Sequence, residues 1–160
     1  MKKFLYIIPG WEDTGLEAGY QTLGAKAQEK GYEVVFKKVD WTKPLSGQVF
    51  DIPKESILFG FSLGAILAWM VAQSSPNSHL ILASMTPHYS FTEKEILKAL
   101  VDLAGDEFIY DIINNLENKH NSDKQTILYG DREAEPADIL VRDTDHELTE
   151  SYINEIVRLL

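Results

Sequence analysis

The chain of 160 residues contains no cysteine, which excludes disulfide bonds, thiol catalysis and cysteine metal ligands. It also lacks any apolar run that approaches the roughly 18 residues of a membrane-spanning helix. The apolar run at residues 4–8 is shorter than the hydrophobic region of a signal peptide, and no small-residue cleavage site follows it. A cytoplasmic protein without a membrane partner is therefore expected.

Positive charge is scarce, with 15 Lys and Arg against 25 Asp and Glu and a net charge of −10. A nucleic acid or an anionic membrane would be repelled by this balance, so neither is an expected partner. Apolar residues make up 44% of the chain and charged residues 25%, which is typical of a globular domain. The length suits a single domain over residues 1–160.

Six apolar runs predict β-strands, and most of them are continuous rather than alternating. They lie at residues 3–9, 33–39, 56–61, 79–84, 125–130 and 139–143. Continuous runs suit strands that are buried on both faces of a parallel sheet. Because stretches with helical spacing separate the runs, the sequence predicts an α/β fold. We expect a doubly wound, mostly parallel six-stranded sheet with helices on both faces.

The segment 87–124 is long for a connection between neighbouring strands, and its pattern predicts two helices. Such an insertion would lie over the carboxyl ends of the strands, where ligands bind in sheets of this kind. The segment is a possible helical lid. An ordinary crossover with one spare helix is the alternative.

The stretch Gly60-Phe61-Ser62-Leu63-Gly64 follows a predicted strand and leads into an apolar helix. A nucleophile elbow has this form: the serine backbone is strained, and the glycines allow other backbone to pack closely. Ser62 would then expose its hydroxyl at a helix N-terminus, where the dipole favours negative charge. The alternative is that Ser62 only caps the helix. A cap does not need glycine at both 60 and 64, so the pattern favours the nucleophile.

On this motif and its context, nearly the whole chain resembles a small, single-domain α/β-hydrolase of the serine esterase type. In that family the acid and the histidine follow the serine in the order Ser, Asp, His. The resemblance implies that Asp131, just after a predicted strand, is the acid, and that His146, after the last strand, is the base. A solvated turn residue at 131 and an exposed loop histidine at 146 are the alternatives. His88 competes with His146, because it follows the strand next to Ser62.

The resemblance also implies an oxyanion hole made of backbone N–H groups. One donor is expected from Leu63, the residue after the nucleophile, and the other from Trp11 in the turn Pro9-Gly10-Trp11. The family often carries His-Gly in this turn, so Pro9 is a departure. The Trp11 side chain could be core or a wall of the pocket.

The expected substrate pocket is apolar and includes Gly10, Phe61, His88 and Tyr89, each of which could equally belong to the core. No cofactor and no metal are expected. The acidic residues 143, 145 and 147 beside His146 match no calcium loop, and no HExxH pair exists. They predict a solvated loop.

One connection challenges this assignment. Only seven residues separate Asp131 from Ile139, whereas a parallel crossover usually takes about a dozen or more. Either the crossover helix is reduced to about one turn, or the last strand is wrongly assigned. If that strand were antiparallel, His146 would lie at the wrong edge of the sheet.

The sequence thus predicts a serine hydrolase that cleaves an ester, or a thioester or amide, of a small acyl substrate. The alternative is a non-catalytic or weakly active binding or regulatory module on the same fold. The sequence carries no prediction of oligomeric state.

Overall fold

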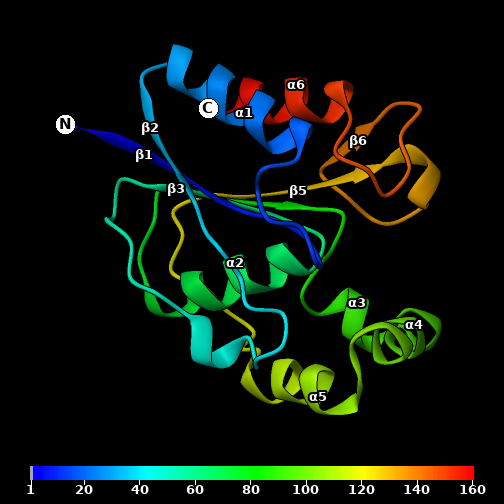
Figure 1. Ribbon diagram of the computed structural model, residues 1–160. Helices are drawn as coiled ribbons and strands as arrows, with labels where there is room; N and C mark the ends of the chain where they lie inside the picture. The colour runs from blue at the N-terminus through cyan, green and yellow to red at the C-terminus, as the bar shows by residue number, and fades with distance from the viewer. Residues whose placement is uncertain (1) are drawn as a thin grey trace.

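The computed structural model describes residues 2–160. Within this range the chain forms one sheet of six strands, all parallel, in the order β2-β1-β3-β4-β5-β6 (Figure 1). The strands are β1 (Lys3–Ile8), β2 (Tyr32–Phe36), β3 (Ile57–Phe61), β4 (His79–Ala83), β5 (Gln125–Gly130) and β6 (Ile139–Val141). Each coincides with a predicted run to within a few residues. The predicted fold class is confirmed.

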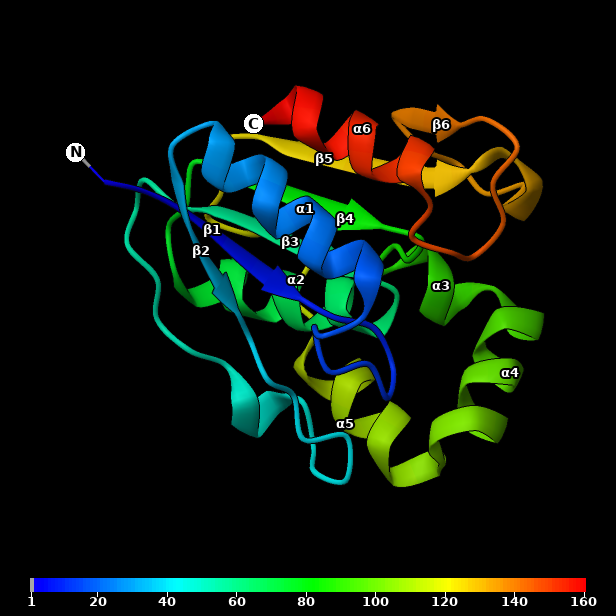
Figure 2. The same cartoon turned by 45° about the horizontal axis from the view of Figure 1, so that its top comes forward.

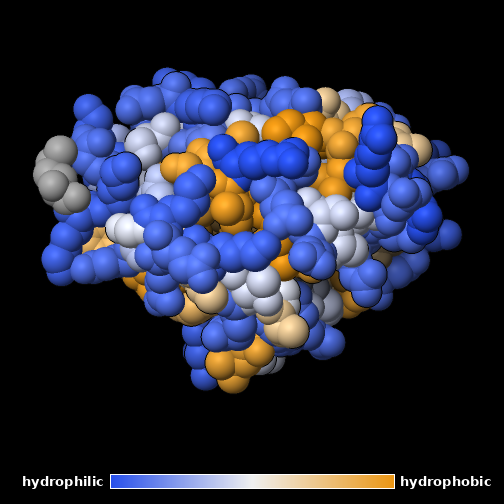
Figure 3. Space-filling view, turned by 90° about the horizontal axis from the view of Figure 1, so that it is seen from above, coloured by the Kyte–Doolittle hydropathy of each residue, from blue (hydrophilic) through white to orange (hydrophobic). Residues whose placement is uncertain are grey.

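Helices cover both faces of the sheet (Figure 1). Helices α1 (Ala18–Glu29) and α6 (Glu150–Leu159) lie side by side on one face. The other face carries α2 (Leu63–Ser74), with α3 (Tyr89–Thr92), α4 (Lys94–Ala104) and α5 (Asp106–Asn115) beyond it. From the side of α1 and α6 the surface is largely hydrophilic, with apolar residues showing between charged ones (Figure 3). Among residues 2–160, no helix has the length and apolar character needed to cross a membrane.

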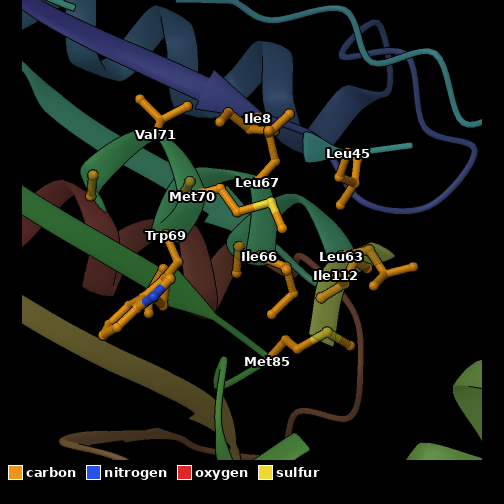
Figure 4. Packing of buried hydrophobic residues seen from close by; sticks show 14 of the residues in the cluster. Ile8, Leu45, Leu63, Ile66, Leu67, Trp69, Met70, Val71, Met85 and Ile112 are labelled. Carbon is orange, nitrogen blue, oxygen red and sulfur yellow. The ribbon is translucent and has the colours of Figure 1, made fainter. Parts of the chain in front are cut away.

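Helix α2 is apolar on all sides because it is covered on all sides, and every residue from Leu63 to Ala72 is buried. Figure 4 shows its side chains reaching toward Ile8 of the sheet on one side and toward Met85 and Ile112 on the other. Ile112 belongs to α5, so part of the segment 87–124 is built into the core. The lid role of this segment stays a prediction.

The sheet brings the functional candidates to one edge. Strand order reverses between β1 and β3, and ligands bind in such sheets outside the carboxyl ends of the strands at this point. The ends of β1, β4 and β5 point toward the side where α3 and the loops around β6 lie (Figure 2). Residues that follow these strands can therefore meet.

The short connection after β5 leads into a last strand that is parallel to β5. A single 3-10 turn, η2 (Asp131–Glu133), replaces the usual crossover helix. Strand β6 then pairs in parallel with β5, with Leu128 opposite Ile139. A hydrogen bond from the Ile127 amide to the Asp138 carboxylate, at 2.8 Å, secures the return. The loop after β6 consequently lies at the same edge as Ser62.

The glycines around Ser62 are required by close backbone packing. A Cβ added at Gly60 would come within 2.3 Å of the Gly64 carbonyl oxygen, and one at Gly64 within 2.3 Å of the Pro9 carbonyl oxygen. Backbone atoms cannot move aside as the end of a flexible side chain can. The turn between β3 and α2 is therefore locked against the end of β1.

We predict that Gly60→Ala lowers the free energy of unfolding by at least about 2 kcal/mol, because the new methyl group must displace backbone. Gly47→Ala is the matched control, since a Cβ there meets no atom within 4 Å. It should change stability by less than about 0.5 kcal/mol. Urea unfolding of both variants measures the difference. Equal stability of the two variants would show that the turn is not tightly packed.

Candidate active site

Ser62 joins the end of β3 to the start of α2 in a strained conformation, with φ 55° and ψ −131°. A non-glycine residue at positive φ persists only where its surroundings hold it. Here the Ser62 amide donates to the Ala83 carbonyl at 2.8 Å, and the Ser62 carbonyl accepts from the Ala65 amide at 2.8 Å. The hydroxyl makes no capping hydrogen bond to α2. Its partner is a histidine.

His146 lies between Ser62 and a carboxylate. Its Nε2 is 2.8 Å from Ser62 Oγ, and its Nδ1 is 2.8 Å from Glu133 Oε1. A ring with the proton on Nδ1 donates to Glu133 and accepts the serine hydroxyl, so one tautomer satisfies both contacts. The structure thus brings together two of the three predicted residues, Ser62 and His146.

Glu133 occupies the position at which Asp131 was expected. Its side chain is only 10% exposed. Its Oε2 accepts from Ser84 Oγ at 2.7 Å and from the Gly130 amide at 2.8 Å. Burial opposes ionisation of this carboxyl, but hydrogen bonds from His146, Ser84 and Gly130 outweigh it and lower the pKa of Glu133. The group is therefore held as a carboxylate facing the imidazole.

The prediction that Asp131 contacts His146 is wrong. The Asp131 carboxylate instead accepts from the Thr144 amide at 3.2 Å. Hydrogen bonds from the amides of Asp143 and then of Thr144 lower the pKa of Asp131. The physical reason is the 3-10 turn after β5: its first residue faces the loop that carries His146, and its third residue turns back to the imidazole. Asp131 thus fastens the loop at residues 142–149 that carries His146, the histidine loop.

The histidine loop crosses the end of β5 at very short range. A Cβ on Gly130 would lie 2.1 Å from the Thr144 carbonyl oxygen, so glycine is needed at this crossing. The same oxygen accepts from the Arg132 amide at 3.1 Å. Asp143 and Asp145 are exposed and lie within ion-pair distance of Arg132. No cluster of metal-ligating side chains occurs anywhere in residues 2–160.

A second element of support lies behind Glu133. Ser84 follows β4 at a positive φ of 57°, and its hydroxyl is 3.0 Å from the phenol of Tyr152. That phenol also donates to the Leu128 carbonyl at 2.7 Å. Tyr152 is fully buried, and burial raises the pKa of its phenol. Glu133 is thus linked through Ser84 and Tyr152 to α6 and to the sheet.

The predicted oxyanion turn lies against the serine. A Cβ built on Gly10 would be 3.3 Å from the Ser62 Cβ and 3.3 Å from the Phe61 ring. Within the described residues, neither the Trp11 amide nor the Leu63 amide donates to a protein acceptor. The Trp11 ring packs against Trp41 and Phe108, with ring centroids 5.4 Å away in both cases.

Two cavities adjoin His146. One of about 280 Å³ is lined by Ser84, Met85, Ser90, Ile96, Tyr129, Glu133, Glu135 and His146. The other, of about 380 Å³, is lined by Asp13, Glu17, Gly19, Tyr20, Phe61, His146, Glu147 and Leu148. Helix α4 contributes to the first through Ile96. A further cavity of about 470 Å³, between residues 41–44 and 104–108, contains no residue of this site.

Of the predicted pocket residues, Phe61 lines a cavity and Gly10 contacts Ser62. His88 and Tyr89 line neither cavity beside His146, in the part of the chain that the structure describes. His88 instead sets the edge of its ring against Trp69 and places Nε2 3.1 Å from the Glu117 carbonyl oxygen. The structure thus does not bring His88 to the cavities beside His146, and its ring lies on Trp69 of α2 instead.

One solved structure with this architecture is the crystal structure of a protein from Agrobacterium vitis S4 that bears the provisional name of hydrolase. It superposes with a TM-score of 0.68 over 99% of this chain and 86% of that chain, at 15% sequence identity. The fold is α/β-hydrolase-like. No protein-family model matches the chain. No curated protein matches it either. At this identity the likeness to the structure concerns the fold.

The contacts around Glu133 in this hydrolase-like fold predict a pH-dependent contribution to stability. The pKa of Glu133 lies below the 4.5 of an unperturbed glutamate, so the unfolded chain takes up a proton first as pH falls. The stabilisation is complete above pH 4.5 and is lost as pH falls through the folded-state pKa. The stability advantage of the wild type over Glu133→Gln should therefore shrink on acidification.

Urea unfolding of the wild type and of Glu133→Gln from about pH 5.5 down to about pH 3 measures this difference. If the stability advantage of the wild type over Glu133→Gln stays constant or grows as pH falls, the lowered pKa of Glu133 is contradicted.

Proposed function

We propose that the protein is a serine hydrolase that cleaves an ester, or a thioester or amide, of a small molecule through an acyl-enzyme on Ser62. The observation that carries this proposal is the hydrogen-bonded line from Glu133 through His146 to Ser62, with 2.8 Å at each contact. Nucleophile, base and orienting acid in hydrogen-bond reach are the geometric signature of covalent catalysis. The strained turn presents the serine for this role.

In the first half of the reaction, Ser62 Oγ attacks the carbonyl carbon of the substrate, and His146 Nε2 takes the hydroxyl proton. The carbonyl oxygen becomes an oxyanion in the tetrahedral intermediate. As this intermediate collapses, the bond to the leaving group breaks and His146 returns the proton to it. The products are the free alcohol, thiol or amine and an ester of Ser62.

In the second half, water attacks the acyl carbon while His146 accepts a proton from it. The bond to Ser62 Oγ then breaks, and the imidazole gives that proton back to the serine. A carboxylic acid is released. Throughout, Glu133 holds the Nδ1–H tautomer and stabilises the imidazolium, which its depressed pKa permits because it remains ionised.

The oxyanion requires donors that are in place before the reaction. We assign them to the backbone amides of Leu63 and Trp11. Both lack a protein acceptor within residues 2–160, and both belong to segments in contact with Ser62. Leu63 also begins α2, so the helix dipole adds to the stabilisation of negative charge.

The two cavities beside His146 favour a small substrate. Their volumes of about 280 and 380 Å³ are at the low end of ligand sites. The same reaction steps would cleave an ester, a thioester or an amide. Esters are the first class to test, since an alcohol departs more readily than an amine. The reaction scheme needs no cofactor. The name of the Agrobacterium vitis protein is compatible with the proposal.

The test is labelling with a fluorophosphonate probe together with hydrolysis of p-nitrophenyl butyrate. We expect stoichiometric modification at Ser62, located by peptide mass mapping, and none in Ser62→Ala. His146→Ala and Glu133→Gln should lower kcat by roughly 10³-fold or more, as loss of triad partners does. Asp131→Asn is the matched control and should stay within about 10-fold of the wild type.

A folded wild-type protein that neither reacts with the probe nor hydrolyses the ester would refute the proposal. The fold would then serve as a binding module. Modification at a residue other than Ser62 would refute the assignment of the nucleophile. An equal loss of kcat in Glu133→Gln and Asp131→Asn would refute the assignment of Glu133.

A further inference from the structure

We propose that Tyr20 is a positioning residue of the oxyanion turn: its buried phenol fixes residues 10–13 so that the Trp11 amide faces the oxyanion. The inference rests on the proposed function and adds to it a residue outside the Ser62, His146 and Glu133 line.

The phenol of Tyr20 bridges the two ends of this turn. It accepts a hydrogen bond from the Gly10 amide at 2.9 Å and donates one to Asp13 Oδ2 at 2.7 Å. The side chain is buried, with 2% of the residue exposed. Burial, helped by the neighbouring Asp13 carboxylate, raises the pKa of the Tyr20 phenol. The phenol therefore keeps its proton and its two contacts throughout the neutral range.

The turn needs such support because it is strained. The Asp13 amide donates to the Gly10 carbonyl at 3.0 Å, which leaves Trp11 and Glu12 as the two central residues. Glu12 has a positive φ of 60°, a backbone conformation that residues other than glycine rarely adopt. The strain of such a residue is sustained only by its surroundings. Tyr20 supplies two hydrogen bonds at the ends of this turn.

The strained turn is the one in contact with the nucleophile, through Gly10 and Ser62. Because the Gly10 amide already donates to the Tyr20 phenol, it is not available to an oxyanion. The Trp11 amide has no acceptor among the described residues and is the next one along. The phenol thus both selects the donor and fixes its position.

The carboxylates near Tyr20 serve the same segment. Glu17 accepts from the Thr14 amide at 2.9 Å and from the Gly15 amide at 2.8 Å. These hydrogen bonds lower the pKa of Glu17 against the opposing effect of desolvation, which is the largest single influence on it. The contacts hold the chain between the turn and α1. Asp13 and Glu17 line a cavity beside His146, but their carboxylates already accept hydrogen bonds from protein groups.

The experiment is Tyr20→Phe, assayed with p-nitrophenyl butyrate and with the rate of fluorophosphonate labelling. Loss of one oxyanion donor costs roughly 10²–10³-fold in kcat, and a misplaced donor should cost at least about 10-fold. We expect kcat and the labelling rate to fall by that factor while KM changes by less than about 2-fold, since the oxyanion forms only after binding.

Tyr32→Phe is the matched control. Tyr32 is also buried, at 8% exposed, and its phenol also donates one hydrogen bond, in this case to the backbone oxygen of Leu160 at 2.7 Å. It begins β2, at the opposite end of the strands from Ser62. This variant should lose comparable thermal stability and keep the wild-type kcat.

Equal kcat in the two tyrosine variants, or a rise in KM without a fall in kcat, would overturn the inference and leave the proposed function standing. If Tyr20→Phe does not fold, Asp13→Ala decides the question, because it removes the acceptor of the phenol. Wild-type kcat in Asp13→Ala would overturn the inference. Absence of Ser62-dependent hydrolysis in the wild type would overturn the proposed function, and the inference with it.

Discussion

The backbone contact between the β3–α2 turn and the end of β1 is the constraint on which the rest of the site depends. Gly64 lies against the carbonyl groups of Ile8 and Pro9, and Gly60 lies against Gly64 itself. This packing leaves no room for a relaxed turn, so Ser62 is held at positive φ with its hydroxyl directed away from the helix. It also brings the turn after β1 beside the serine. Ser62 and the turn at residues 10–13, the nucleophile and the oxyanion turn of the proposed function, are thus placed by a single contact.

A second close approach places His146 and Glu133, the proposed base and acid. The chain returns from β5 to β6 through one 3-10 turn, and the loop after β6 crosses the end of β5 at Gly130. Asp131 fastens that loop, whereas Glu133 reaches back to the imidazole and is itself held by Ser84. The imidazole is therefore positioned from two sides. The proposed general base catalysis requires an imidazole that is oriented in this way before the substrate binds.

The strands, their parallel arrangement and the positions of Ser62 and His146 follow from sequence because they rest on long apolar runs and on a five-residue glycine motif. The acid does not. Residues 131–135 contain three carboxylates, and which one faces His146 depends on the rotation of a single turn. The seven-residue connection allowed only such a turn, and a glutamate three residues after Gly130 was the available signal. The place of His88 could not be predicted either, because its ring packs on Trp69, a contact between residues far apart in the sequence that no local pattern marks.

The most direct measurement of the central claim is the NMR signal of the His146 Nδ1 proton in protein labelled with ¹⁵N-histidine. A proton shared between an imidazole and a carboxylate at 2.8 Å resonates far downfield and exchanges slowly enough to be observed. We predict that this resonance is present in the wild type and in Asp131→Asn and is lost in Glu133→Gln. Its loss in Asp131→Asn and persistence in Glu133→Gln would contradict the account and return the role of the acid to Asp131.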